Sequence, residues 1–171
     1  MILITTSRRP ARRVRSFCKD LARVIPRAVK INRGKKSLYE VLTEAAQRNL
    51  PYVLIVETWK GNPGDMFFYR ADVAGAKEPL AVLRVKSVKL QREINRETKI
   101  GEVKGIVIQS QGQTELAKFL SKVFEGGDEE EKKLVLSIES SGEKEFIINF
   151  KIREKEIGPR IKFKVLRLGL V

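Results

Sequence analysis

The sequence has no histidine and only one cysteine, Cys18. A disulfide within the chain is therefore excluded, and the commonest general base and the commonest metal ligand are missing. Zinc sites and Ser-His-Asp or Cys-His catalysis are excluded with them. The acidic residues Glu154, Glu156 and 128–131 fall in charge-rich loops, a setting that does not indicate catalytic carboxylates. Composition alone does not exclude carboxylate-based or purely electrostatic chemistry, but these residues offer no catalytic candidate, and we expect no metal or cofactor.

Long hydrophobic runs are also missing. No stretch approaches the roughly 18 apolar residues of a membrane span. The apolar start at 1–4 is followed at once by arginines, which reverses the order of a secretory signal peptide. With 171 residues, 42% of them hydrophobic and 33% charged, the composition fits one globular domain or two small joined halves. We expect a soluble, intracellular protein of the cytoplasm that is a monomer and contacts no membrane.

Acidic residues are scarce at the start of the chain. Residues 1–36 contain twelve Lys and Arg residues and one acid, Asp20, so they hold +11 of the formal net charge of +14. The positive charge is thus a local feature. Such an excess attracts polyanions, above all the phosphates of nucleic acids.

A basic helix accounts for much of this charge. Apolar residues at i, i+3, i+4 and i+7, beginning at Val14, predict a helix that starts within 7–10, with Ser7 as a cap, and ends near Val24. A second stripe along it is basic: Arg8, Arg12, Arg15, Lys19 and Arg23, flanked by Arg9 and Arg13. Like charges at i, i+4 repel and cations oppose the dipole at a helix N-terminus, so these residues do not stabilise the helix. We interpret them as a phosphate-contacting surface, with a solvated face as the alternative.

Two further basic segments are candidates for phosphate contact. The loop 32–36 combines Gly34 with the three cations Arg33, Lys35 and Lys36, but it lacks the residue order of a Walker loop. A solvated helix start is the alternative there. The strand pattern of 160–170 places Arg160, Lys162 and Lys164 on one face. For this strand, RNA contact and the protection of an exposed sheet edge both stay open.

Aromatic residues make up only 7% of the chain. Trp59 precedes a predicted turn, and Phe67, Phe68 and Tyr69 follow on the next predicted strand. An exposed ring among them could stack on an unpaired base, whereas core packing and a protein contact are the alternatives.

The predicted elements form a pattern that occurs twice. Helices are expected over 7–24, 37–49 and 113–127, and strands over 2–5, 28–31, 52–58, 66–71, 80–90, 104–110, 133–141, 144–154 and 160–170. Val14, Phe17 and Leu21 match apolar positions of the last helix at an offset of 102, and 53–58 matches 135–140 at an offset of 82. Because the offset falls from 102 to 82, we expect the second copy to lack one loop and one helix of the first.

The repeated pattern predicts the organisation of the fold. We expect one α/β (α+β) domain over 1–171, with two structurally similar halves at 1–90 and 103–171 and a connector at 91–102. Each half would have a mixed sheet with flanking helices, and the second would be shortened by one helix. Chance similarity between apolar strands is the alternative.

Four segments together resemble the Brix domain of ribosome-biogenesis proteins in its compact archaeal form. They are "ITTSRRPARRVRSFCKDLARVIP" at 4–26, "INRGKKSLYEVLTEA" at 31–45, "YVLIVETWKGNPGDM" at 52–66 and "EIGPRIKFKVLRL" at 156–168. The resemblance covers nearly the whole chain. It implies a fold of two similar halves related to an anticodon-binding domain.

The resemblance also implies a function. It points to an RNA-binding, non-enzymatic factor in rRNA processing and ribosomal subunit assembly, with rRNA or pre-rRNA, a guide small RNA and other assembly proteins as partners, and with RNA annealing as an associated activity. The positions that it carries over as RNA contacts are Arg8, Arg9, Arg12, Arg13, Arg33, Lys35 and Arg160. The alternative is a protein-interaction scaffold in a pre-ribosomal complex, whose basic helix docks an acidic partner.

Overall fold

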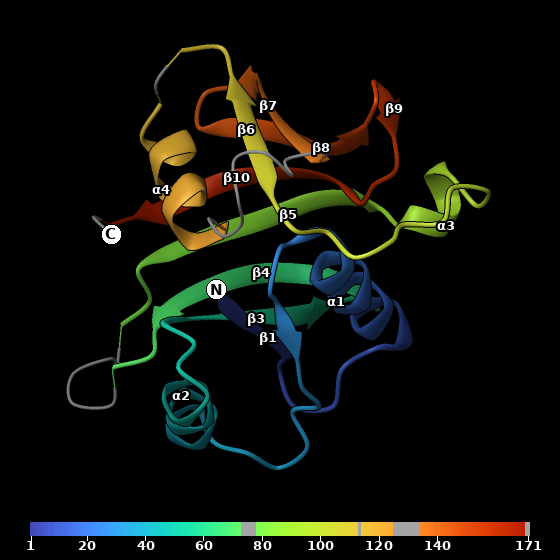
Figure 1. Cartoon of the computed structure of the whole chain (residues 1–171). Helices are drawn as coiled ribbons and strands as arrows, with labels where there is room; N and C mark the ends of the chain where they lie inside the picture. The colour runs from blue at the N-terminus through green and yellow to red at the C-terminus, as the bar shows by residue number, and fades with distance from the viewer. Residues whose placement is uncertain (73–77, 113, 125–133, 170–171) are drawn as a thin grey trace.

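A computed structural model describes residues 1–72, 78–112, 114–124 and 134–169 (Figure 1). The chain first forms β1 (Ile2–Thr6), α1 (Arg12–Val24), β2 (Val29–Lys30), α2 (Leu38–Gln47), β3 (Tyr52–Trp59), β4 (Asn62–Arg70) and β5 (Ala81–Lys89). It then forms α3 (Gln91–Ile94), β6 (Ile106–Ser110), α4 (Glu115–Phe124), β7 (Leu134–Gly142), β8 (Glu145–Ile152), β9 (Lys155–Glu156) and β10 (Arg160–Leu168). The expectations for 113, 125–133 and 170 lie outside the described residues.

The strands join into one curled mixed sheet. Their order is β2-β1-β3-β4-β5-β10-β8-β7-β6, and β9 pairs with β8 beside this path. Strands β2, β1 and β3 run parallel to one another, as do β6 and β7. All other neighbouring strands are antiparallel.

The two ends of the sheet have similar topologies. In one, α1, β2 and α2 lie between β1 and the parallel strand β3, and β4 and β5 follow antiparallel. In the other, α4 connects β6 to the parallel strand β7, and β8 and β10 follow antiparallel. Pairing between β5 and β10 joins the halves edge to edge. The fold is therefore α/β with two similar halves, although the boundaries 1–90, 91–102 and 103–171 stay a prediction.

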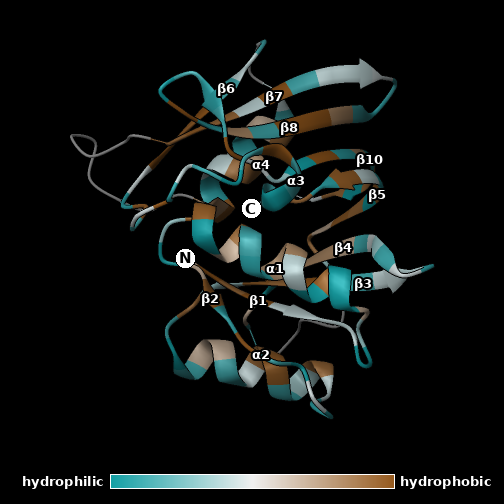
Figure 2. Ribbon diagram, turned by 90° about the vertical axis from the view of Figure 1, so that its right-hand side faces the viewer, coloured by the Kyte–Doolittle hydropathy of each residue, from teal (hydrophilic) through white to brown (hydrophobic). Residues whose placement is uncertain are grey.

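The core lies mainly on one face of the sheet. Helices α1 and α4 pack on that face, whereas α2 packs on the other (Figure 2). Strand residues alternate between the two faces, so Ile4 contributes to the core under α1 and Leu3 to the cluster under α2. The ring of Phe119 in α4 meets Phe68 of β4 edge to face at 5.4 Å. The two halves therefore share one core. Within the described residues, every helix lacks the length and apolar content that a membrane span requires.

Helix α2 starts where the sequence predicts, and α1 does not. Ser37 accepts a hydrogen bond from the Glu40 N–H at 3.2 Å, and the Glu40 carboxylate accepts from the Ser37 N–H at 2.6 Å, which is a complete capping box. By contrast, Ser7 donates its N–H to Val56 and continues the pairing of β1 with β3. Arg9 has a φ of 55°, which interrupts any helix there. The prediction of a Ser7 cap is wrong, and α1 begins at Arg12.

Candidate nucleic-acid interface

The outer face of α1 carries basic side chains without ion-pair partners in the described part of the chain. Val14, Phe17 and Leu21 are buried against the sheet, and the opposite side of the helix is exposed. The cations on or just before that side are Arg8, Arg9, Arg12, Arg15 and Lys19. The first turn of α1 contains no acidic residue. Because the helix dipole adds to these charges, this end of α1 is strongly positive.

Arg13, one of the predicted RNA contacts, joins α1 to α3. Its guanidinium donates hydrogen bonds to both carboxylate oxygens of Glu93 and, at 2.8 Å, to the carbonyl of Val88. The hydrogen bond from Arg13 lowers the pKa of Glu93 below its ordinary value. The Glu93 carboxylate also accepts from the Leu90 N–H at 2.6 Å. Arg13 therefore fastens α1 to the start of the connector.

Asp20, the one acid of the basic segment, also joins α1 to α3. Its Oδ2 accepts a hydrogen bond from the Gln91 N–H at 2.9 Å. Burial raises the pKa of Asp20, against the opposing effects of this hydrogen bond and of Arg23. Arg23 lies 3.8 Å from the Asp20 carboxylate, and half of its side chain, 51%, stays exposed. Arg23 is thus only partly available to a ligand.

The loop 32–36 is held in place by one of its own predicted RNA contacts. Arg33 is only 8% exposed, and its guanidinium donates to the Lys36 carbonyl at 2.7 Å and to the Thr6 carbonyl at 3.0 Å. Burial lowers the pKa of Arg33. Lys36 is half-buried and donates to the Asn32 carbonyl at 3.2 Å. Lys35 is the exposed cation that this loop adds to the surface.

The parallel strands explain why these residues meet. The carboxyl ends of β2, β1 and β3 lie at the same edge of the sheet. Arg8 and Lys35 lie in the loops that follow β1 and β2, and Trp59 is the last residue of β3, so all three lie at that edge. Two hydrogen bonds join the first and third of these segments, from the Ser7 N–H to the Val56 carbonyl at 2.9 Å and from the Ala11 N–H to Thr58 Oγ1 at 3.2 Å. We use the name helix group for the exposed cations at this edge and along the outer face of α1. They are Arg8, Arg9, Arg12, Arg15, Lys19 and Lys35.

A second basic group lies where the two halves join. Arg160, Lys162 and Lys164 of β10 stand opposite Lys89, Ser87 and Arg84 of β5. Ile161 and Phe163 belong to the core under α1 and α4, so the basic residues between them face the other side of the sheet. Two of the cations have acidic partners, because Arg160 pairs with Glu156 and Arg84 with Asp65. We call Arg84, Lys89, Arg160, Lys162 and Lys164 the seam group.

The position of β10 excludes one interpretation of its charges. The strand lies between β5 and β8 and is not at an edge of the sheet. The prediction that its lysines protect an exposed edge is therefore wrong. Arg84 and Lys89 were missed, because the alternating pattern of β5 does not reveal which strand it pairs with.

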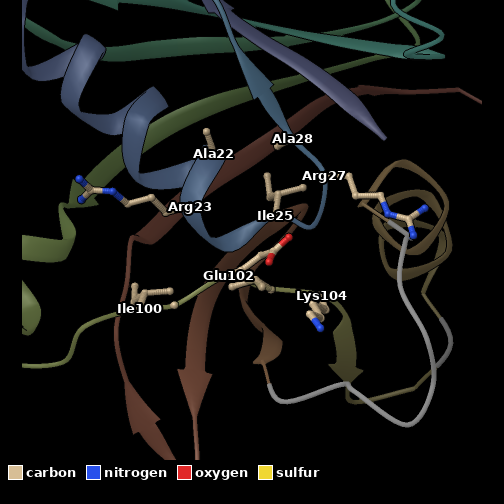
Figure 3. A pocket seen from close by; sticks show the side chains of 10 residues that line it. Ala22, Arg23, Ile25, Arg27, Ala28, Ile100, Glu102 and Lys104 are labelled. Carbon is tan, nitrogen blue, oxygen red and sulfur yellow. The ribbon is translucent and has the colours of Figure 1, made fainter.

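A cavity separates the end of α1 from the connector (Figure 3). It is open to solvent, has a volume of about 990 Å³ and is lined by Ala22, Arg23, Ile25, Arg27, Ala28 and residues 100–104. Figure 3 shows the guanidinium groups of Arg23 and Arg27 directed to opposite sides, with the Glu102 carboxylate between them. The polar groups that line the cavity therefore do not converge on one point, as the groups of a ligand site would. In the described residues no three His, Cys, Asp or Glu side chains are placed to hold a metal ion.

Comparison with known proteins gives the family. No family model matches the chain. A protein of Methanococcus maripaludis described as a probable Brix domain-containing ribosomal biogenesis protein is 31% identical over 98% of this chain and 98% of its own length. This chain belongs to the Brix-domain family. A Pyrococcus horikoshii protein of the same description is 48% identical over 94 residues, 55% of this chain and 42% of that protein. The matched part therefore spans less than half of that relative.

Solved structures have the same Brix-domain fold. The crystal structure of a probable ribosomal biogenesis protein from Aeropyrum pernix matches 99% of this chain and 98% of its own, with a TM-score of 0.82 and 28% identity. The crystal structure of an archaeal Imp4-like protein matches 95% of this chain and 99% of its own, with a TM-score of 0.65 and 25% identity. The fold expected from the sequence is thus confirmed.

Proposed function

We propose that this Brix-domain protein is an RNA-binding factor of ribosome biogenesis that acts in rRNA processing and subunit assembly. It would hold rRNA or pre-rRNA mainly through backbone phosphates, without a catalytic step. The helix group carries this proposal, because its six cations are exposed and have no ion-pair partner within the described residues. Adjacent positive charges repel one another, and a chain of phosphates relieves that repulsion. The names of the relatives support the setting in ribosome biogenesis.

The seam group suggests how the protein could promote RNA annealing. It lies on the sheet face opposite α1 and α4, so it is separate from the outer face of α1. Two separate basic surfaces can neutralise two RNA strands at once, and this neutralisation lowers the repulsion between the strands. We therefore expect that charge reversal in either group slows the annealing of complementary oligonucleotides.

A salt titration tests the RNA-binding proposal. If all six cations of the helix group contact phosphates of a single strand, the logarithm of the binding constant should fall with the logarithm of salt concentration with a slope of about −4. The double variant R12E/R15E should bind every RNA sequence at least about tenfold more weakly. The matched control K99E/K155E reverses two exposed lysines outside both groups and should bind normally. A binding constant that salt does not change would refute phosphate contact.

Co-purification separates this proposal from the scaffold alternative. Crosslinked rRNA that is recovered with the protein, and lost with R12E/R15E, supports RNA binding. An acidic protein partner that stays bound after nuclease treatment, and is lost with the same variant, supports the scaffold.

A further inference from the structure

Trp59 is exposed at the tip of the β3–β4 hairpin. Its side chain is 68% exposed, and it is the one tryptophan of the chain. The alternative that Trp59 packs in the core is therefore wrong. Single exposed apolar side chains are common on protein surfaces, so the surroundings of the ring decide what it can bind.

The hairpin fixes the backbone position of Trp59. Lys60 and Gly61 form the two-residue turn with positive φ angles of 47° and 77°, as expected for a tight turn that matches the twist of the strands. Gly64 leaves room for Trp59, because a Cβ added to Gly64 would lie 3.0 Å from the Trp59 Cβ. Thr58, the residue before Trp59, accepts a hydrogen bond from the Ala11 N–H. Thr58 is thus hydrogen-bonded to the start of α1.

The surroundings of Trp59 are charged and polar. The Lys60 Nζ lies over the ring, 5.6 Å from its centroid. Glu57 and Asn62, close to it along the hairpin, are exposed as well. Among the described residues, the other large exposed apolar side chains are Met1, Tyr39 and Leu166, and they belong to other segments. Large exposed apolar patches of several hundred Å² mark protein-docking sites, and the described residues form no such patch around this ring.

The hairpin tip also lies beside the helix group. Trp59 follows the residue that contacts the first turn of α1 and the helix group. An RNA strand that the helix group holds would therefore pass close to the ring. Stacking on an aromatic ring suits any unpaired base, because every base has a π-face.

We propose that Trp59 stacks on an unpaired base of the RNA that the helix group holds. Paired bases are already stacked and leave no face for the ring, so Trp59 would give the protein a preference for single-stranded RNA or loops over duplex. The inference rests on the proposed RNA-binding function. It adds a residue that selects the structural state of the RNA, whereas phosphate contacts alone do not distinguish one sequence from another.

The single tryptophan makes the test direct. Its fluorescence is measured while a single-stranded oligonucleotide, or a duplex of the same length, is added to the whole chain. We expect strong quenching by the single strand and little by the duplex. W59A should bind the single strand about five- to a hundredfold more weakly and the duplex with unchanged affinity, since stacking contributes only to the former. W59F, which retains a ring, should keep most of the affinity.

Controls separate this inference from the proposed function. Tyr39 on α2 is 62% exposed. Y39A removes this ring and should change neither the single-strand affinity nor the duplex affinity. Circular dichroism and thermal melting of W59A should match the original protein, because the ring is exposed. RNA binding with a normal salt dependence but without quenching would overturn the stacking and leave the proposed function intact. An equal loss of single-strand and duplex affinity in W59A would also overturn it. Failure to bind any RNA would refute both.

Discussion

Arg12 and Arg13 are neighbours in sequence, and the structure assigns them opposite roles. Arg12 is exposed on α1, whereas Arg13 is bound by Glu93 and by the Val88 carbonyl. We predict that R13A lowers the free energy of unfolding and that R12A does not. The ion pair alone contributes about 0.2–1 kcal/mol, because 27% of the Arg13 side chain and 36% of the Glu93 side chain are exposed. The charged hydrogen bond to Val88 adds to this, so the expected loss is about 1–3 kcal/mol.

Urea unfolding of the two variants measures the difference. The melting temperature of R13A should fall by several degrees, at about 2–4 °C per kcal/mol for a chain of this size. In a double-mutant cycle, R13A and E93A should show a coupling energy of about 0.5–1 kcal/mol. RNA affinity should respond in the opposite way, with the larger loss in R12A. Equal stability of R12A and R13A would refute the role assigned to Arg13.

Three further outcomes follow from buried groups. Burial raises the pKa of Cys18 to about 12, so a thiol reagent at pH 8 should label it only after unfolding; labelling of the folded protein within minutes would contradict this. Burial also raises the pKa of Asp20 above its ordinary 3.8, so the folded protein favours the protonated carboxyl. The stability that this protonation contributes is complete below pH 3.8 and is lost as the pH rises. D20N should therefore be at least as stable as the original protein at pH 7, and any difference in the free energy of unfolding should vanish in urea titrations at pH 3. R33A leaves the Thr6 and Lys36 carbonyls without their donor and should cost about 1–3 kcal/mol of stability by urea titration, whereas K35A at the exposed position nearby should cost almost none.

Local patterns in the sequence predicted the elements and their repetition. The capping box of Ser37 and Glu40 and the apolar stripe of α1 depend on residues within a few positions of one another. The offset between the two halves reflects the same local periodicity. A helix start depends on backbone geometry as well, and Ser7 failed as a cap because β1 continues its pairing past Thr6.

The roles of individual cations depended on residues far away in the sequence. Arg13 and its partner Glu93 are 80 positions apart, so no local pattern distinguishes Arg13 from Arg12. Arg33 lies in a loop whose composition indicates exposure, but its guanidinium is buried because it donates a hydrogen bond to the Thr6 carbonyl at the end of β1. The seam group forms because β5 pairs with β10. The alternating pattern within a strand does not reveal which strand it pairs with, so the sequence did not predict this group.

The central position of β10 sets the order in which the protein can be completed during synthesis. Strand β5 ends at Lys89, and its partner β10 begins at Arg160, 71 residues later. A ribosome that adds about 5–20 residues per second needs about 4–14 s to make that segment. Throughout this interval one edge of β5 has unpaired backbone groups, which are the usual template for aggregation between chains. A nascent first half is therefore a vulnerable intermediate, and the emergence of β10 protects it.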